Sequence, residues 1–213
     1  VAGLEADSAV DDVTVAWSAP GAERRARVDV EEAPGSPSVA TDMKFNRVAA
    51  DFFDAFGARV IAGRALRDSD GTGSAQGVVV NRAFVNQVRG GANAVGRQIR
   101  YGEAGTTRYE IVGVVKDLDL GSPNRKDRAA GLYMPAPVER FSEVYMLVHA
   151  RGEPMALSPK VREIAAVVDP ALRLSGFQRG DEALKGGMWL IALRVSIVMT
   201  IVALLLSLAG IYA

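Results

Sequence analysis

The residues that come closest to a metal-binding pattern lie in a polar, glycine-rich stretch. Asp68, Asp70, Thr72 and Gly73 occupy positions 1, 3, 5 and 6 of a calcium-binding EF-hand loop. Position 12 of such a loop should be a glutamate that binds calcium through both oxygens, and here it is Val79. The residues that follow also have a strand pattern rather than a helical one. We therefore interpret residues 63–77 as a polar surface loop without a metal.

Neither glycine cluster fits a nucleotide-binding motif. The glycines between 71 and 77 precede a strand pattern, whereas a dinucleotide fingerprint needs a strand before it and a helix after it. The segment 180–186 reads GDEALKG, which lacks the glycine before the lysine and the serine or threonine after it that a P-loop requires. We expect no nucleotide or other cofactor to bind this chain.

Two further groups of polar residues could in principle do chemistry. His149 is the single histidine and belongs to a strand pattern, with no Gly-x-Ser-x-Gly nucleophile motif in the sequence, so we expect a surface or partly buried sheet residue. Asp117 and Asp119 follow an apolar strand pattern and precede a charged loop, and we interpret them as a solvated face. No catalytic residue is predicted, and the chain is not expected to be an enzyme.

Composition excludes several classes of function. Lys+Arg and Asp+Glu are both 25, so the formal net charge is zero and no basic footprint for nucleic acid is present. The chain has no cysteine, which excludes disulfides, thiolate nucleophiles and cysteine-based zinc sites together.

The end of the sequence has the pattern of a membrane-spanning helix. Residues 195–213 contain no charge, and nineteen residues at ~1.5 Å each are about as long as a ~30 Å hydrocarbon core. Arg194 closes this run, and Trp189 and Tyr212 lie near its ends, where we expect them to act as membrane-interface anchors. The alternative interpretation is a helix buried in a protein core.

The rest of the chain alternates short strand and helix patterns. Asn81 is expected to cap one helix and Ser158, followed by Pro159, to cap another, whereas 132–135 is expected to be an edge strand ended by proline. Strands are predicted at 10–17, 27–31, 45–48, 77–80, 98–101, 109–116, 132–135, 143–150 and 172–177, and helices at 51–56, 81–88 and 158–168.

Several of these segments together resemble one family. VAADFFDAFGARVIAGRALRDSD at 48–70 and VVVNRAFVNQVRGGANAVGRQIR at 78–100 are similar to consecutive motifs of macrolide-exporter-like permease domains. YEIVGVVKD at 109–117 and LYMP at 132–135 resemble the motifs that follow them. SLAGIYA at 207–213 is similar to the end of the second transmembrane helix in FtsX-like permeases. The sequence thus resembles the extracytoplasmic, periplasmic core domain and following helix of a MacB/FtsX-like bacterial ABC-transporter permease.

The resemblance implies an α+β fold with two lobes. Residues 1–46 and 136–183 would form a membrane-proximal, porter-like first lobe, and 47–135 an inserted second α/β lobe. Residues 184–213 would be a connector and a C-terminal transmembrane helix, with Gly186 and Gly187 as a hinge. In the family a first transmembrane helix precedes the domain, so the opening of the first lobe is expected to be incomplete here.

The same resemblance implies the function and the partners. The domain would transmit ATP-driven conformational change across the membrane for export or mechanotransmission, with ATP hydrolysed by a separate cytoplasmic ABC subunit or domain. A homodimer or paired permease, contact with membrane lipid and a periplasmic adaptor are also expected. Residues 1 to about 185 would lie outside the cytoplasm, anchored in the bacterial inner membrane. The alternatives are a single-span sensor or interaction domain without an ATPase partner, and a membrane-anchored enzyme.

Overall fold

The computed structural model describes residues 2–19, 22–31, 38–71, 76–101, 107–118, 129–135 and 143–180. The chain divides into two compact units, Val1–Ser175 and Gly176–Ala213, and nearly all described residues belong to the first. The predicted connector and the apolar run at 195–213 lie outside the described residues. None of the helices among the described residues has the length and hydrophobicity of a membrane span.

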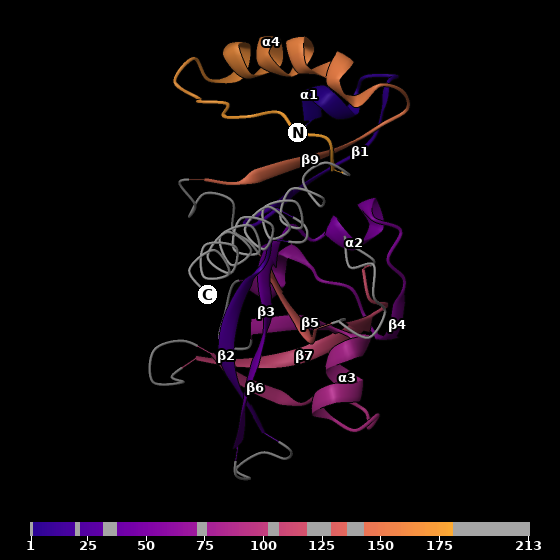
Figure 1. Ribbon diagram of the computed structural model, residues 1–213, viewed down its shortest axis with the longest axis vertical. Coiled ribbons are helices and arrows are strands. Elements are labelled where there is room, and N and C mark those ends of the chain that lie inside the picture. Colours follow the sequence, from indigo (N-terminus) through magenta and orange to yellow (C-terminus); the bar gives the residue numbers. More distant parts are fainter. Residues whose placement is uncertain are drawn as a thin grey trace, which may run out of the picture. The chain divides into compact units, whose positions relative to one another are not determined.

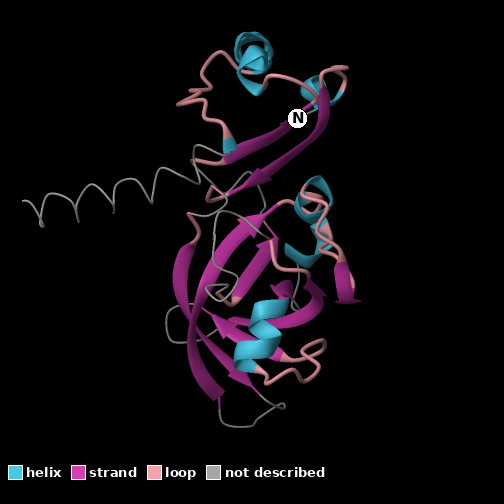
Figure 2. Cartoon of the chain, turned by 45° about the vertical axis from the view of Figure 1, so that its right-hand side comes forward, coloured by secondary structure: helices cyan, strands magenta, loops and turns pink. Residues whose placement is uncertain are grey.

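Six strands of the first unit pair into a closed ring (Figures 1 and 2). The order around the ring is β2-β6-β7-β5-β8-β3, and β3 pairs with β2 again to close it. The pairs β5–β7 and β3–β8 are parallel and the other four are antiparallel. Because the ring closes, none of these strands leaves a long unpaired edge within it. The strands are β2 (Arg24–Glu31), β3 (Ser38–Val48), β5 (Gln76–Asn81), β6 (Gln98–Tyr101), β7 (Thr107–Val115) and β8 (Gly131–Pro135).

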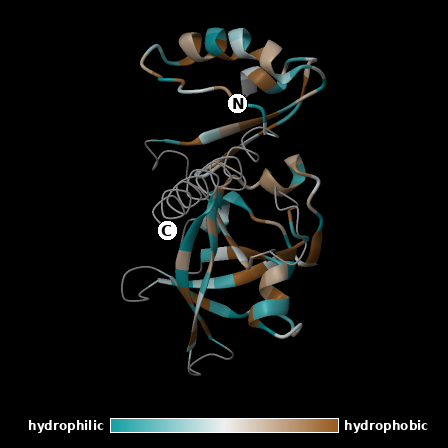
Figure 3. Cartoon of the chain, viewed as in Figure 1, coloured by the Kyte–Doolittle hydropathy of each residue, from teal (hydrophilic) through white to brown (hydrophobic). Residues whose placement is uncertain are grey.

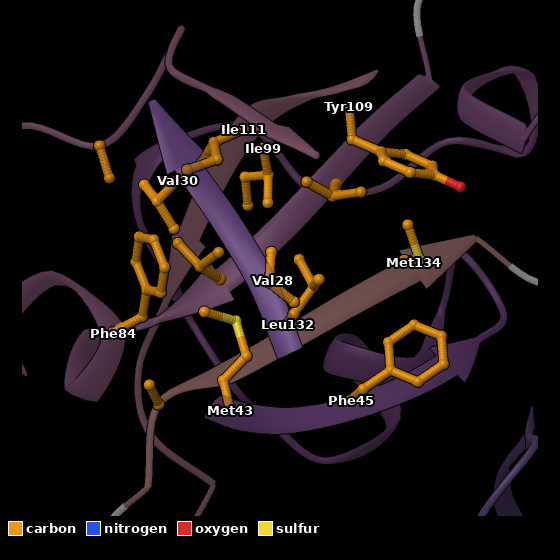
Figure 4. Close-up of a cluster of buried hydrophobic side chains, with 14 of the residues drawn as sticks. Val28, Val30, Met43, Phe45, Phe84, Ile99, Tyr109, Ile111, Leu132 and Met134 are labelled. Carbon is orange, nitrogen blue, oxygen red and sulfur yellow. The ribbon is translucent and has the colours of Figure 1, made fainter. Parts of the chain in front are cut away.

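The ring closes around an apolar core because alternate residues of its strands point inward. Val30 pairs with Ile99, and Ile99 pairs with Tyr109, so one inward-facing row crosses three strands. Each such side chain stabilises the fold by about 1.5–3 kcal/mol when it is fully buried. Figure 4 shows these side chains gathered inside the ring. The labelled members are Val28, Val30, Met43, Phe45, Phe84, Ile99, Tyr109, Ile111, Leu132 and Met134.

A second, smaller core joins the ring to short elements at its side. Phe52 and Phe53 of α2 (Phe52–Ala55) are each 1% exposed, and both pack on Tyr133 of β8. β4 (Val60–Gly63) pairs with β7, and the 3-10 helix η1 (Asp68–Gly71) follows it. α3 (Arg82–Val88) continues directly from β5 and closes over the main core with Phe84.

The remaining strands lie off the ring. β1 (Val10–Ala16) and β9 (Tyr145–Ala150) form an antiparallel pair, and β1 reaches β3 through Ala16 and Val48. The short helix α1 (Ala2–Glu5) precedes β1, and the 3-10 helix η5 (Pro154–Leu157) and α4 (Ser158–Val168) follow β9. The mixed α+β class predicted from the sequence is confirmed. The division into two lobes stays a prediction.

Several local predictions differ from the structure. β8 is no edge strand: it pairs with both β3 and β5, and all five of its residues are buried, so Pro135 ends an interior strand. The stretch 63–77 is not only loop, since it holds the end of β4, η1 and the start of β5. Ser158 is the first residue of α4 and makes no side-chain cap. Residues 172–177 join no strand.

Candidate functional site

The junction between β1 and the ring holds buried polar side chains and is a candidate functional site. Asn46 is 1% exposed, and its side-chain oxygen accepts the N–H of Ser18 at 3.0 Å while its Nδ2 donates to the Ser18 carbonyl at 3.0 Å. Thr14 is 2% exposed and donates its hydroxyl to Asp51 at 2.6 Å. Buried hydrogen bonds of this kind favour one arrangement of the elements that they join. They link Thr14 of β1 to Asp51, and Ser18, just after β1, to Asn46 of β3.

Backbone hydrogen bonds strengthen the same junction. The N–H of Trp17 donates to the Arg47 carbonyl at 2.8 Å, and the N–H of Ala49 donates to the Val15 carbonyl at 2.9 Å. β1 therefore pairs with β9 along its length and with β3 of the ring at its end.

A clamp at the side of the ring is built from Arg64 and Asp70. Both guanidinium nitrogens of Arg64 donate to the two Asp70 oxygens, each at 2.7 Å, and the N–H of Arg67 donates to Asp70 at 2.8 Å. Asp70 lies in η1 and is 6% exposed, so the polar turn predicted here folds inward. The hydrogen bond from Arg64 is the main reason that the pKa of Asp70 is lowered, and it likewise raises the pKa of Arg64.

Two glycines permit this clamp by letting backbones approach closely. A Cβ on Gly113 of β7 would overlap the carbonyl oxygen of Arg64. Gly63 has a φ of 70°, and a Cβ there would come within 2.3 Å of the carbonyl oxygen of Val112. The glycine and arginine of the GR pair at 63–64, which belong to the family-like motif, therefore have structural tasks: close backbone approach and the ion pair.

Asn81 and Asp117 form a third polar group, at the start of α3. The Asn81 side chain accepts the N–H of Phe84 at 2.9 Å, as the predicted cap should, and also the N–H of Gly131 at 2.8 Å. Asp117 was expected on a solvated face, but it is 9% exposed and accepts the N–H of Ala83 at 2.8 Å. Its partner is a backbone donor at the helix start, which sequence spacing did not reveal. His149 is exposed, as predicted, and Asp119 lies outside the described residues.

The polar side chains of the junction, of the clamp and of the start of α3 bond to one another and to the backbone, and so stabilise the fold. A cavity of about 270 Å³ beside the clamp is lined by Arg64, Asp70, Gly77, Val95, Glu110 and Val112. In the wall of this cavity, two nitrogens of the Arg64 guanidinium already donate to the two carboxylate oxygens of Asp70. Among the described residues no cluster of three or more histidine, cysteine or acidic side chains could hold a metal ion.

The functional residues predicted from the sequence lie elsewhere. The hinge glycines Gly186 and Gly187 and the anchors Trp189, Arg194 and Tyr212 are outside the described residues. Sequence reasoning missed the junction residues Asn46 and Asp51. The signal available was a single amide side chain, Asn46, within the strand pattern 45–48, where a polar residue among buried neighbours needs partners.

Comparison with known proteins defines the class. The family model described as MacB-like periplasmic core domain matches residues 4–173. Solved structures with the same fold include the periplasmic region of MacB from Actinobacillus actinomycetemcomitans, with 16% identity and a TM-score of 0.53 over 78% of this chain and 71% of that one. A permease-protein domain from Porphyromonas gingivalis has 20% identity and a TM-score of 0.54 over 83% of each chain.

The extracellular domain of the ABC-type transporter YknZ from Gram-positive bacteria is similar too, with 16% identity and a TM-score of 0.52 over 79% of this chain and 80% of that one. No curated protein matches the chain. The family match covers well over half of the sequence. The chain belongs to the MacB-like periplasmic core domains, so it is part of the extracytoplasmic region of an ABC-transporter permease, and the family resemblance is confirmed.

Proposed function

We propose that this domain transmits ATP-driven conformational change from the membrane to the extracytoplasmic side, for export or mechanotransmission. The observation that carries the proposal is the family match over residues 4–173, which includes β1, β9 and the whole ring. The buried hydrogen bonds of Asn46 and Thr14 support it, because a movement of β1 is passed on to the ring only if the junction between them keeps its geometry.

The partners follow from the same role. ATP is hydrolysed by a cytoplasmic ABC subunit or domain, and the permease works as a homodimer or paired permease with a periplasmic adaptor. Residues 195–213 cross the bacterial inner membrane and contact its lipids, with Trp189, Arg194 and Tyr212 at the interfaces. Residues 1 to about 185 lie outside the cytoplasm.

The two lobes belong to this proposal as well. β2 and most of β3 lie within 1–46. β2 pairs with β6 and β3 pairs with β8 of the inserted region, which favours assigning both strands to the second lobe. The first lobe then consists of α1, β1, β9, η5 and α4.

The proposal places a hinge between the domain and the membrane at Gly186 and Gly187. Adjacent glycines weaken a helix, so Gly186 and Gly187 are placed to act as a hinge in the connector. A Gly186→Ala, Gly187→Ala double variant should couple ATP hydrolysis to transport less tightly than the wild type, measured as transport per ATP in vesicles. Coupling equal to that of the wild type would remove the hinge from the proposal.

A spin label tests the transmission. The chain has no cysteine, so His149→Cys, at an exposed position on β9, introduces a single labelling site within it. In the intact transporter, distances between the labels of two permease copies should shift when ATP is added. The matched control is the same labelled permease with an ATPase partner that binds ATP but does not hydrolyse it. In this control the label distances should stay at those of the ATP-bound state. Identical distance distributions in all states would contradict transmission through this domain.

A further inference from the structure

β4 is an exposed strand that adds nothing to either core of the ring. All four of its residues are exposed, and neither cluster of buried apolar side chains includes any of them. Val60 and Ile61 are 37% and 42% exposed. In Figure 3 β4 has the brown colour of hydrophobic residues, at the right-hand side of the ring where Figure 1 labels it. Burial of its own side chains therefore does not explain why β4 lies against β7.

Other contacts fix β4 at both of its ends. At the end of the strand, Gly63 and Gly113 let the two backbones approach closely, and the Arg64–Asp70 clamp follows directly. At its start the N–H of Lys116 donates to the carbonyl of the residue before β4 at 3.0 Å. The fold thus holds in place a strand that buries no side chain, which directs attention to the side of β4 that faces away from β7.

That side of β4 is an unprotected strand edge. β4 pairs with β7, and among the described strands none pairs with its other side. Edge strands are commonly protected by charged residues or proline, and the sequence of β4, VIAG, contains neither. An extended segment can join such an edge as one more strand, with affinity from the backbone hydrogen bonds and specificity from the side chains.

Charge at the start of β4 indicates which kind of segment fits. Arg59 and Lys116 are both exposed, and they are neighbours across the two strands because Val60 pairs with Val115. Like charges that lie opposite each other on paired strands are destabilising, and a carboxylate placed beside them would remove the repulsion. β4 has no carboxylate of its own, so a second copy paired through the same strand would not bring one from that strand.

We propose that the free edge of β4 binds an extended segment of another extracytoplasmic protein, which adds to the sheet as a strand. This segment has apolar side chains that cover Val60 and Ile61, and an acidic residue that lies beside Arg59 and Lys116. The inference rests on the strand edge and its charges and does not depend on transmission of ATP-driven movement.

Two synthetic peptides test the proposal on the intact permease in detergent. Both are short runs of alternating valine and threonine, one with a glutamate at each end and the other with a lysine at each end. In fluorescence anisotropy the glutamate peptide should bind about tenfold more tightly, because attraction to Arg59 and Lys116 replaces repulsion. The double variant Arg59→Glu, Lys116→Glu should reverse this preference. Equal binding of the two peptides, or binding of neither, would overturn the proposal.

A substitution within the edge gives an independent readout. Ile61→Ser should weaken binding of the glutamate peptide roughly tenfold through lost apolar contact, and should leave the melting temperature unchanged because the side chain is exposed. Val39→Ser is the matched control, since Val39 on β3 is 59% exposed and its loss should not affect binding. Equal binding by Ile61→Ser and the wild type would contradict docking on β4. A disulfide that links two permease copies through Ile61→Cys after oxidation would identify the occupant as a second copy, and our assignment would be wrong.

Discussion

At the scale of single residues, Asp70 is the polar side chain on which we expect stability to depend most. Its carboxylate is almost buried and takes three hydrogen bonds, two of them from one guanidinium. An ion pair of this bidentate kind fixes geometry as well as charge, because both partners must keep one orientation. The clamp ties η1 to the residues that follow β4.

Asp70→Asn should destabilise the domain by about 2–3 kcal/mol, because it leaves the Arg64 guanidinium with a poorer partner in a partly buried place. Chemical unfolding monitored by circular dichroism gives the difference. Asp68→Asn in the same 3-10 helix is the control, since Asp68 is exposed and its change should stay within about 0.5 kcal/mol. Equal effects of the two variants would show that the clamp contributes nothing.

Acid should remove the contribution of Asp70. Its pKa is lower in the folded protein than in the unfolded chain, so the ionised form favours folding. The stabilisation is complete above the unfolded carboxyl pKa of about 3.9 and is lost as pH falls through the lower folded pKa. The stability difference between wild type and Asp70→Asn should therefore be constant near neutrality and shrink below about pH 4. A difference that grows on acidification would contradict this sign.

At the scale of elements, close backbone contact decides how β4 lies on β7. Gly113→Ala should prevent the native pairing, since the added carbon would overlap the backbone oxygen of Arg64, which cannot rotate away. We expect loss of several degrees in melting temperature or failure to fold. Gly152→Ala is the matched control, because a carbon there meets nothing within 4 Å. Equal melting temperatures for Gly113→Ala and the wild type would mean that β4 can detach without cost.

Local pattern was enough to predict most elements, and pairing was what it missed. The alternation in β1 and the cap at Asn81 are local signals, and the structure has both. β8 was placed at an edge because proline cannot continue a ladder, yet its place between β3 and β5 depends on residues far away in sequence. Asp117 was misjudged for the same reason: its partner, the N–H of Ala83, is 34 residues away.

At the scale of the whole molecule, closure of the ring depends on few contacts. β2 and β6 share only the pairs Asp29–Arg100 and Val30–Ile99, and Glu31 and Arg100 form an ion pair beside them. No sequence pattern predicts the pairing of β2 with β6, because it joins segments about seventy residues apart. The family motifs did signal the fold as a whole, since their order follows the order of the ring strands along the chain.

The proposed function requires that this domain belongs to a working ABC transporter. The direct test is to purify the full-length parent protein from detergent-solubilised membranes and to identify what accompanies it. We predict an ATP-binding-cassette subunit, or such a domain in the same reading frame, whose ATPase activity co-purifies with the permease. If neither is found, a membrane-anchored sensor or interaction domain without an ATPase partner becomes the leading hypothesis, and the proposed transmission of ATP-driven movement is contradicted.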